Sequence, residues 1–272
     1  MVETSGLPVR EADAVKGDNG HVLVVAGSDR YTNTPAIVSL GSLRTGVDLV
    51  TAALPGRSSS ITPGFALNII SEPLRGSYLE EKHTETVLEL AEDVDVLAIG
   101  PGLGREPETM AAVRSIMEGY GGKVVVDADA IHAVAEEPEV LEEETVITPH
   151  VGEFEVLTGG HPGETLEGRK DAVKEAAKDL GCTILLKGVE DIISDRDNLE
   201  VNTTGNPYMA RGGTGDVLTG ITAGLLAQSM DPFPAAVTAA EINGEAGEKA
   251  LEENGPGFLL EDMLEEVSEL LG

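Results

Sequence analysis

The chain has 272 residues, of which 49 are acidic and 18 basic, and its formal net charge is −31. A surface of that sign repels nucleic acid and anionic membranes, so we expect neither as a partner. The acidic residues stand between well-formed apolar runs, which favours a folded protein with an acidic shell over a disordered chain. Such a shell is typical of halophilic proteins, and an acidic protein from an ordinary cytoplasm is the alternative.

The cysteine content and the lengths of the apolar runs bear on the cellular compartment of this protein. The chain has one cysteine, Cys182, for which we expect a core position, and no disulfide is possible within the chain. The N-terminus lacks a secretory signal pattern, and no stretch approaches the ~18–20 apolar residues that span a bilayer. We therefore expect a cytoplasmic protein with a single domain over 1–272, whose residues 1–15 form an irregular arm.

Apolar runs that suit buried strands alternate with segments of helical periodicity. Strands are expected at 21–27, 47–54, 94–99, 123–126, 145–148 and 183–186, with short β segments at 192–194 and 199–201. Helices are expected at 35–45, 79–91, 107–117, 128–135, 166–180, 216–227, 234–251 and 258–271. Because the strands are continuous apolar runs between helices, the sequence predicts an α/β fold of three layers, α/β/α, with a mostly parallel central sheet.

Polar and glycine-rich segments follow the expected strands, at the sheet edge where open α/β sheets bind ligands. These segments are 27–29, 100–104, 127–129, 149–153 and 187–188. Asp127 and Asp129 end a strand, and at least one should point into the cleft unless both are turn carboxylates. Lys187 could reach a phosphate, or its stem could cover apolar surface while its charge stays in water.

The strongest local signal is the run Gly212-Gly213-Thr214-Gly215-Asp216 at the start of an expected helix. Successive glycines expose backbone N–H groups, which together with the helix dipole bind an anion. Asp216 in the first turn could accept a proton from a hydroxyl that attacks phosphorus. A plain Asp cap is the alternative, and the five loop residues in this order favour the catalytic interpretation.

His150 and Glu153 are three residues apart and would share a face if this segment is helical. Glu153 could hold a hydrated Mg²⁺ and His150 could contact a substrate, with a surface capping pair as the alternative. The run Gly100-Pro101-Gly102-Leu103-Gly104 would let a ligand approach the backbone closely. It is neither a Walker loop nor a convincing dinucleotide fingerprint, because its order differs from G-x-G-x-x-G.

Taken together, these segments resemble the ADP/ATP-dependent NAD(P)H-hydrate dehydratases of the ribokinase-like superfamily. The matching stretches are 16–28, 43–46 with 49–51, 99–104, 127–130, 148–153, 186–188, 204–207 and 212–218, in the family's order. The resemblance implies a ribokinase-like fold. It also implies a standalone form without the epimerase domain to which many relatives are fused, so that any epimerase in the pathway would be separate.

The resemblance implies a metabolite-repair reaction. Family members use ADP or ATP to phosphorylate the hydroxyl of (6S)-hydrated NADH or NADPH, then eliminate phosphate and restore the dihydronicotinamide, which makes them lyases. The implied cofactors are ADP or ATP and Mg²⁺, and a homo-oligomer, with a tetramer favoured, is implied as well. Two alternatives stay open: a ribokinase-like kinase for a thiazole or pyrimidine alcohol, and a nucleotide-sensing protein without catalysis.

The resemblance also implies residue roles. Asp216 is the catalytic base and contacts the hydrate, whose site is further lined by Thr34, Gly102, Gly104 and His150, and Glu153 organises Mg²⁺ through water. The nucleotide site comprises Lys187, Gly188, Val189, Glu190, Asp191, Asn202, Gly205, Asn206, Gly212, Gly213, Thr214 and Gly215. The chain departs from the family pattern at four positions: Thr34, Asp191, Tyr208 and Arg211. These departures leave the preference between ADP and ATP open.

Overall fold

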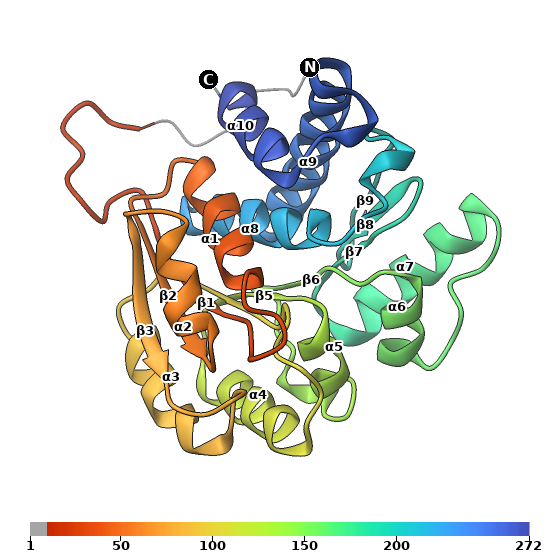
Figure 1. Cartoon of the computed structure of the whole chain (residues 1–272). Helices are drawn as coiled ribbons and strands as arrows, with labels where there is room; N and C mark the ends of the chain where they lie inside the picture. Colours follow the sequence, from red (N-terminus) through yellow and green to blue (C-terminus); the bar gives the residue numbers. More distant parts are fainter. Residues whose placement is uncertain (1–9, 272) are drawn as a thin grey trace.

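The computed structural model describes residues 10–271, and its strands form one sheet with the order β3-β2-β1-β4-β5-β6-β7-β8-β9 (Figure 1). The strands are β1 (His21–Val25), β2 (Leu49–Pro55), β3 (Ile69–Leu74), β4 (Val96–Ile99), β5 (Lys123–Val126), β6 (Thr145–Ile147), β7 (Thr183–Leu186), β8 (Asp191–Ser194) and β9 (Leu199–Asn202). The pairs from β3 to β7 are parallel, whereas β8 pairs antiparallel with both of its neighbours. The expected mostly parallel sheet is confirmed.

Helices cover both faces of this sheet (Figure 1). One face carries α1 (Thr34–Arg44), α8 (Thr214–Ala227), α9 (Pro232–Asn254) and α10 (Leu260–Leu270), and the other carries α3 (Thr84–Ala91), α4 (Pro107–Gly119), α5 (Asp129–Val134), α6 (Val151–Thr158) and α7 (Leu166–Leu180). Successive β1 residues alternate between the two cores: Val22 and Val24 face α8, and Leu23 and Val25 face α4. Burial on both faces explains the unbroken apolar strands, and the predicted three layers are confirmed.

The structure corrects the prediction between residues 55 and 78, where the sequence had indicated no element. This segment contains α2 (Ser58–Ile61) and the edge strand β3, which pairs with β2. Three of the six β3 residues are exposed, and Glu72 and Pro73 interrupt what would be the apolar run of a central strand. A proline is tolerated there because an edge strand has one side without ladder hydrogen bonds.

Two other expectations about the chain ends and the cysteine can be compared with the structure. Residues 10–20 form turns without a helix or strand, and residues 1–9 of the predicted arm lie outside the described part. Cys182 is buried in the core, and burial raises the pKa of its thiol to about 12. No helix within residues 10–271 is long and apolar enough to cross a membrane.

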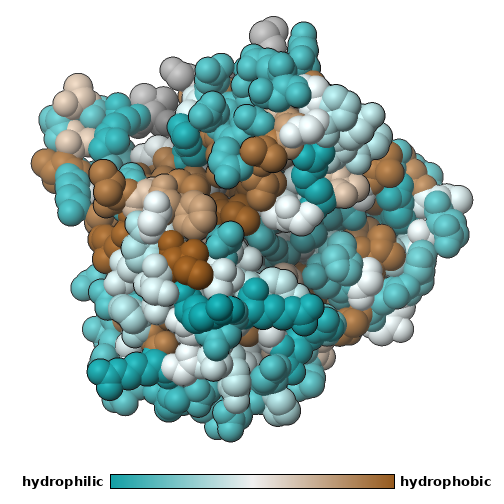
Figure 2. Space-filling model, viewed as in Figure 1, coloured by the Kyte–Doolittle hydropathy of each residue, from teal (hydrophilic) through white to brown (hydrophobic). Residues whose placement is uncertain are grey.

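Almost all carboxylates of the described chain lie at or near the surface. Within residues 10–271, the acidic residues that are buried as whole residues are Asp127, Glu153 and Glu266, while Asp191 and Asp216 are half-buried and the side chain of Asp48 is 6% exposed. Hydrophilic residues accordingly cover much of the face in Figure 2. Two of these three buried residues lie at the carboxyl edge of the sheet, Asp127 directly after β5 and Glu153 in the first turn of α6.

Helices α1 and α8 approach each other closely because small residues face one another. A Cβ atom on Gly220 would lie 2.3 Å from the carbonyl oxygen of Val38 and 2.9 Å from the Cα of Gly41. The Ser42 hydroxyl donates a hydrogen bond of 2.9 Å to the carbonyl oxygen of Gly220. This contact between distant parts of the chain fixes α8, and with it the loop that precedes α8, over the sheet.

Replacing Gly220 with alanine should therefore destabilise the protein, although alanine has the higher helix propensity. Overpacking costs about 1–3 kcal/mol, and the backbone of α1 cannot move as a flexible side chain can. The measurement is the free energy of unfolding in urea. Gly121→Ala is the matched control, since a Cβ there meets no atom within 4 Å. Equal stability of the two variants would contradict a tight contact between α1 and α8.

Candidate active site

Loops from distant parts of the sequence meet at the carboxyl edge of the parallel strands. The N–H of Gly27 donates to the carbonyl oxygen of Pro101, and the N–H of Lys187 donates to that of Pro149, at 2.9 and 2.8 Å. β1 lies between β2 and β4, so the strand order changes direction beside it. Open α/β sheets bind ligands at such a reversal.

The glycines after β4 are required by their surroundings. Gly100 has φ +129°, and a Cβ there would lie 1.9 Å from the carbonyl oxygen of Asp127. Gly102 has φ +68°, and its Cβ would meet Tyr31 at 2.6 Å and Thr34 at 3.2 Å. These close approaches bring two residues of the predicted hydrate site, Thr34 and Gly102, side by side. They also place Tyr31 there, which the sequence analysis did not name.

The glycine loop forms the expected helix start. Gly213 precedes α8 with φ +100°, and Asp216 lies in the first turn. The backbone N–H groups of Thr214, Gly215 and Asp216 have no hydrogen-bond partner among the described residues. Free N–H groups at the positive end of a helix dipole bind anions. The geometry is therefore that of an anion site with a carboxylate in the same turn.

A buried ion pair lies beside this helix start. The Nζ of Lys187 is 2.8 Å from Oδ1 of Asp127 and 4.0 Å from Oε2 of Glu153. The Thr219 hydroxyl donates to the other oxygen of Asp127, also at 2.8 Å. Nζ also lies 3.4 Å from the place of a Cβ on Gly215. Burial by itself would lower the pKa of Lys187, but the Asp127 and Glu153 carboxylates raise it above its usual value, so the amine is charged.

The environment of Asp216 changes its acidity. Burial, the largest cause, and the Asp127 carboxylate raise the pKa of its carboxyl, the Lys187 ammonium lowers it, and the net result is a pKa of about 7. A base is most effective when its pKa is close to the working pH. Asp216 therefore combines the position and the acidity of a general base, while Asp127, held by two hydrogen bonds, is a fixed charge beside it.

His150 and Glu153 form a capping box at the start of α6. The N–H of His150 donates to Glu153 Oε2 at 2.8 Å, and the N–H of Glu153 donates to His150 Nδ1 at 3.2 Å. The capping alternative is thus present, although the Glu153 carboxylate is buried while the His150 ring is exposed. No group of three or more possible ligands for a metal ion occurs within residues 10–271. Direct coordination by this set does not fit, and a role of Glu153 through water stays a prediction.

The predicted nucleotide residues after β7 form a closed loop. Asp191 accepts hydrogen bonds from the Gly188 N–H at 2.9 Å and from the Asn202 amide at 3.1 Å. Burial raises the pKa of Asp191, although both hydrogen bonds act against this. Its carboxylate therefore holds the loop together. Glu190 is paired with Arg169 at 2.5 Å, and the Val189 side chain is 88% exposed.

The predicted segment before α8 is docked on α9. The Gly205 N–H donates to Glu248 and the Asn206 amide donates to the Gly247 carbonyl, at 2.8 and 2.7 Å. Arg211 lies 4.1 Å above the Phe258 ring and donates to the Phe258 carbonyl oxygen. These contacts attach the segment before the glycine loop to α9 and to the residues just before α10. Arg211, one of the departures from the family pattern, makes one of these contacts.

Sequence reasoning overlooked two residues that support the site. Thr219, which binds Asp127, lies three residues after Asp216 in α8, and this helical spacing was a usable signal. Arg169, which binds Glu190, comes from α7, and nothing in its sequence surroundings indicated the pairing.

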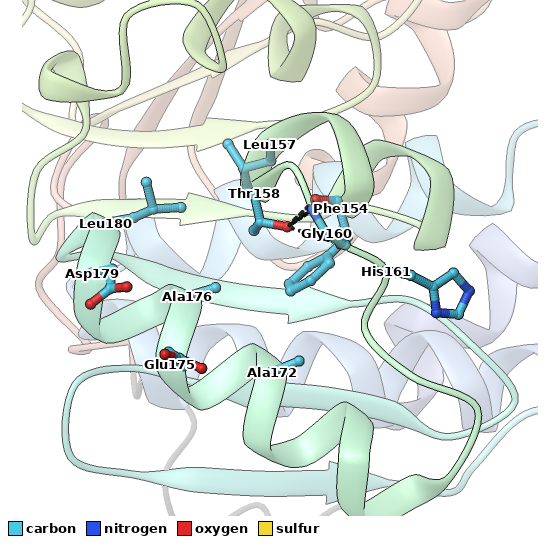
Figure 3. Close-up of a pocket in the computed structure, with 10 residues that line it drawn as sticks. All are labelled: Phe154, Leu157, Thr158, Gly160, His161, Ala172, Glu175, Ala176, Asp179 and Leu180. Atoms are coloured by element: carbon cyan, nitrogen blue, oxygen red, sulfur yellow. Dashed lines mark hydrogen bonds between the residues drawn. The ribbon is translucent and has the colours of Figure 1, made fainter.

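Away from the strand-end site, a cavity of about 380 Å³ lies between α6 and α7 (Figure 3). Its lining is apolar around Phe154, with Glu175, Asp179 and His161 as its ionisable groups. No described lysine or arginine lines it. This lining does not suit a phosphate-bearing ligand, so the strand-end site remains the candidate.

Comparisons with known proteins identify relatives over nearly the whole chain. The family model described as NAD(P)H-hydrate dehydratase matches residues 22–269. The chain is 44% identical to a bifunctional NAD(P)H-hydrate repair enzyme of Pyrobaculum aerophilum, over 96% of this chain and 52% of that protein. It is 37% identical to an ADP-dependent (S)-NAD(P)H-hydrate dehydratase of Cenarchaeum symbiosum, over 95% and 91% respectively. The chain spans about half the length of the bifunctional relatives it matches.

Solved structures are similar over nearly the whole chain. An ADP/ATP-dependent NAD(P)H-hydrate dehydratase from Bacillus subtilis, co-crystallised with ATP/Mg²⁺, has a TM-score of 0.79 at 27% identity, over 99% of this chain and 96% of that one. A ribokinase-like superfamily protein from Enterococcus faecalis has a TM-score of 0.85 at 24% identity, over 97% and 91%. The fold of this chain is therefore ribokinase-like.

The raised pKa of Asp216 predicts a pH-dependent effect of Asp216→Asn on stability. Between about pH 4 and about pH 7 the folded protein keeps a proton on this carboxyl that the unfolded chain loses, so the wild type loses stability as the pH rises through this range. The variant has no such charge to bury. Its melting temperature should exceed that of the wild type at about pH 8, and the difference should shrink toward about pH 4.

Asp171→Asn removes the same charge from an exposed position on α7 and serves as the control. An increase in melting temperature for Asp216→Asn that is no larger than that of Asp171→Asn, or that does not depend on pH, would show that the pKa of Asp216 is not raised.

Proposed function

The chain belongs to the NAD(P)H-hydrate dehydratase family, and from this premise we propose that it converts the (6S)-hydrates of NADH and NADPH back to NADH and NADPH at the expense of ADP or ATP. The observation that carries the proposal is the first turn of α8, where free N–H groups adjoin a carboxyl with a pKa of about 7. Phosphoryl transfer needs both an anion site and a base for the attacking hydroxyl.

In the proposed first step the hydrate hydroxyl attacks the terminal phosphorus of the nucleotide. Asp216 takes the hydroxyl proton as the new O–P bond forms and the bond to the leaving AMP or ADP breaks. The N–H groups of Thr214 and Gly215, with Gly212 and Gly213 allowing close approach, bind the phosphoryl oxygens. In the second step the C–O bond breaks and phosphate leaves with the bonding electrons. The neighbouring ring carbon gives its proton to the departing phosphate or to water, which restores the double bond and makes the protein a carbon–oxygen lyase.

The nucleotide site is proposed to extend from the Lys187 ammonium along 188–191, 202 and 205–206. Lys187 supports this role because its charged Nζ lies beside Gly215. Mg²⁺ would neutralise phosphate charge, and since this ion is usually held by substrate phosphates with few protein ligands, it would arrive with the nucleotide. Glu153 is then expected to act on it through water. His150, Thr34, Gly102 and Gly104 are proposed to line the hydrate site.

The proposal is tested by mixing the protein with hydrated NADH and either ADP or ATP. Recovery of the reduced-nicotinamide absorbance, dependent on nucleotide and specific for the S epimer, is the expected result. Nucleotide consumption by a thiazole or pyrimidine alcohol without any recovery of hydrated NADH would instead identify an alcohol kinase. Tight ADP or ATP binding with no turnover of any substrate would identify a nucleotide sensor.

Asp216→Asn sharpens this test, because loss of a general base costs about 10²–10⁴ in rate. Turnover should fall by this factor while the affinity for ADP, measured by calorimetry, stays close to that of the wild type. Unchanged kinetics would remove Asp216 from the mechanism.

The compartment, the oligomeric state and the place in a pathway are also proposals. We expect the protein to act in the cytoplasm, to form a homo-oligomer with a tetramer favoured, and to act in the same pathway as an epimerase. Gel filtration with light scattering measures the assembly.

An acidic shell adapted to high salt is proposed from the charge of −31 and from the position of the described carboxylates, few of which are buried. Repulsion among surface carboxylates weakens as salt shortens the range of their fields. The melting temperature should therefore fall as KCl is withdrawn, with most of the loss at the lowest concentrations. A melting temperature independent of KCl would contradict the halophilic interpretation.

A further inference from the structure

The acidic residues are distributed unevenly along this chain. The two longest runs without an acidic residue, 30–47 and 49–71, are consecutive, and Asp48 between them is the single acidic residue of the whole region. The Asp48 side chain is 6% exposed and lies beside Arg10. Since acidic residues make up 49 of the 272 residues overall, this region interrupts the acidic shell.

The fold brings the acid-poor region together on one side of the sheet. The region comprises α1, β2, α2, the turn Thr62–Gly64 and the start of β3, and both α1 and β3 contact that turn. On the face shown in Figure 2, the brown hydrophobic residues gather over α1 and α2. We refer to the exposed residues between 57 and 71 as the acid-poor patch: Arg57, Ser60, Pro63, Gly64, Phe65, Leu67, Asn68 and Ile70.

The acid-poor patch exposes three large hydrophobic side chains within six residues. Phe65 is 47% exposed, Ile70 is 40% exposed, and Leu67 is fully exposed. Ala66 between them packs against the core, which fixes this segment to the body of the protein. Single exposed hydrophobic residues are ordinary, but a group of them marks a surface that another molecule covers.

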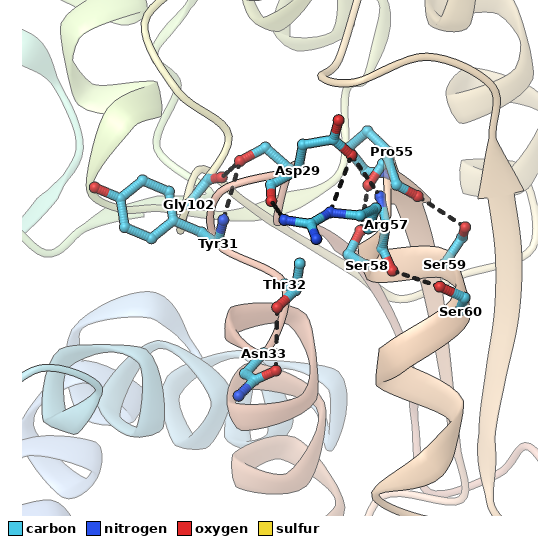
Figure 4. Close-up of polar contacts among 12 residues, drawn as sticks. Asp29, Tyr31, Thr32, Asn33, Pro55, Arg57, Ser58, Ser59, Ser60 and Gly102 are labelled. Carbon is cyan, nitrogen blue, oxygen red and sulfur yellow. Dashed lines mark hydrogen bonds and ion pairs between the residues drawn. The ribbon is translucent and has the colours of Figure 1, made fainter.

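The polar groups around these hydrophobic residues are already engaged within the chain. The three serine hydroxyls of α2, at 58–60, each donate to the carbonyl oxygen three residues earlier (Figure 4). The Arg57 guanidinium donates to the Asp29 carbonyl oxygen at 2.7 Å (Figure 4). Polar groups that keep their hydrogen bonds are buried at little cost, so a partner can cover this surface.

The strand at the border of the acid-poor patch is an edge of the sheet. β3 pairs with β2 on one side and has no ladder partner on the other side among the described residues. Proteins usually protect such edges with charged residues or proline. Glu72 and Pro73 protect the second half of β3, but Ile69, Ile70 and Ser71 in its first half are uncharged. The unprotected half adjoins Leu67.

We propose that the acid-poor patch binds a second copy of this chain, patch against patch around a two-fold axis. Two chains with a net charge of −31 repel each other wherever their carboxylates face one another. They can therefore approach at low cost where both surfaces lack carboxylates, and two-fold symmetry pairs the patch with its own counterpart. The inference names a surface for the homo-oligomer proposed above and does not depend on the reaction.

The charge distribution argues against other partners at this surface. A basic protein would be attracted to the acid-rich remainder of the molecule, and the net charge repels an anionic membrane. A neutral partner protein is the alternative, and it predicts that the purified chain is monomeric.

The test is the mass of the protein in solution, measured by gel filtration with light scattering over a range of protein concentrations. The wild type should have the mass of two or four chains of 28.3 kDa. Leu67→Glu should have half of the wild-type mass, because it places two like charges across the axis. Its dissociation constant should rise about tenfold or more. Leu67 is fully exposed in the single chain, so the melting temperature of the dissociated variant reports that it still folds.

Val156→Glu is the matched control, because it adds the same charge at an exposed residue of α6, on the opposite face of the sheet. Its mass should equal that of the wild type. A monomeric wild type, an unchanged mass for Leu67→Glu, or an equal loss of mass in both variants would overturn the proposal.

Hydrogen exchange locates the contact independently. Exchange of the backbone amides of 65–71 should slow as the wild type assembles with rising protein concentration, and it should stay fast in Leu67→Glu. Exchange that does not depend on concentration in an assembled wild type would also overturn the proposal. Neither measurement needs a substrate, so failure of the proposed function would leave both results unaffected.

Discussion

The ammonium group of Lys187 is the charge on which the arrangement at the carboxyl edge of the sheet depends. It lies 2.8 Å from Asp127 and 4.0 Å from Glu153, and its field opposes the rise in the pKa of Asp216. Buried carboxylates without a compensating cation are strongly destabilising. Since the same ammonium lies beside Gly215, the group that compensates these carboxylates also adjoins the first turn of α8.

The first turn of helix α8 carries both the N–H groups of the anion site and the Asp216 carboxyl. The acidity of this carboxyl depends on the fixed charge of Asp127. Thr219, one turn further along α8, binds that fixed charge directly. The helix therefore sets both the position of the Asp216 carboxyl and the surroundings that tune its acidity. The close contact with α1 at Gly220 holds the helix in register with the strand ends.

The sequence predicted the parts of this arrangement that follow from strand order and local pattern. Parallel strands place the loops after them at one edge, so the polar segments were expected to gather there, and the glycine run before Asp216 indicated a helix start. The sequence analysis did not predict strand β3, because an edge strand with Glu72 and Pro73 has no apolar run. The sequence analysis also did not predict the contacts of Asp29 with Arg57 and of Asp129 with Arg105. Such pairings join loops that are distant in sequence, and no local pattern encodes them.

The late position of α8 in the sequence has a consequence for biosynthesis. The residues of β1, β4 and β5 that face α8 are made long before residues 214–227, so this apolar side of the nascent sheet stays uncovered while most of the chain is translated. Partly folded chains with such surfaces are prone to aggregate. A ribosome-bound chain that ends before α8 would therefore need the ribosomal exit tunnel, a chaperone or slow assembly of the sheet to protect this apolar surface. The surface would be covered when α8, the helix that completes the site, is added.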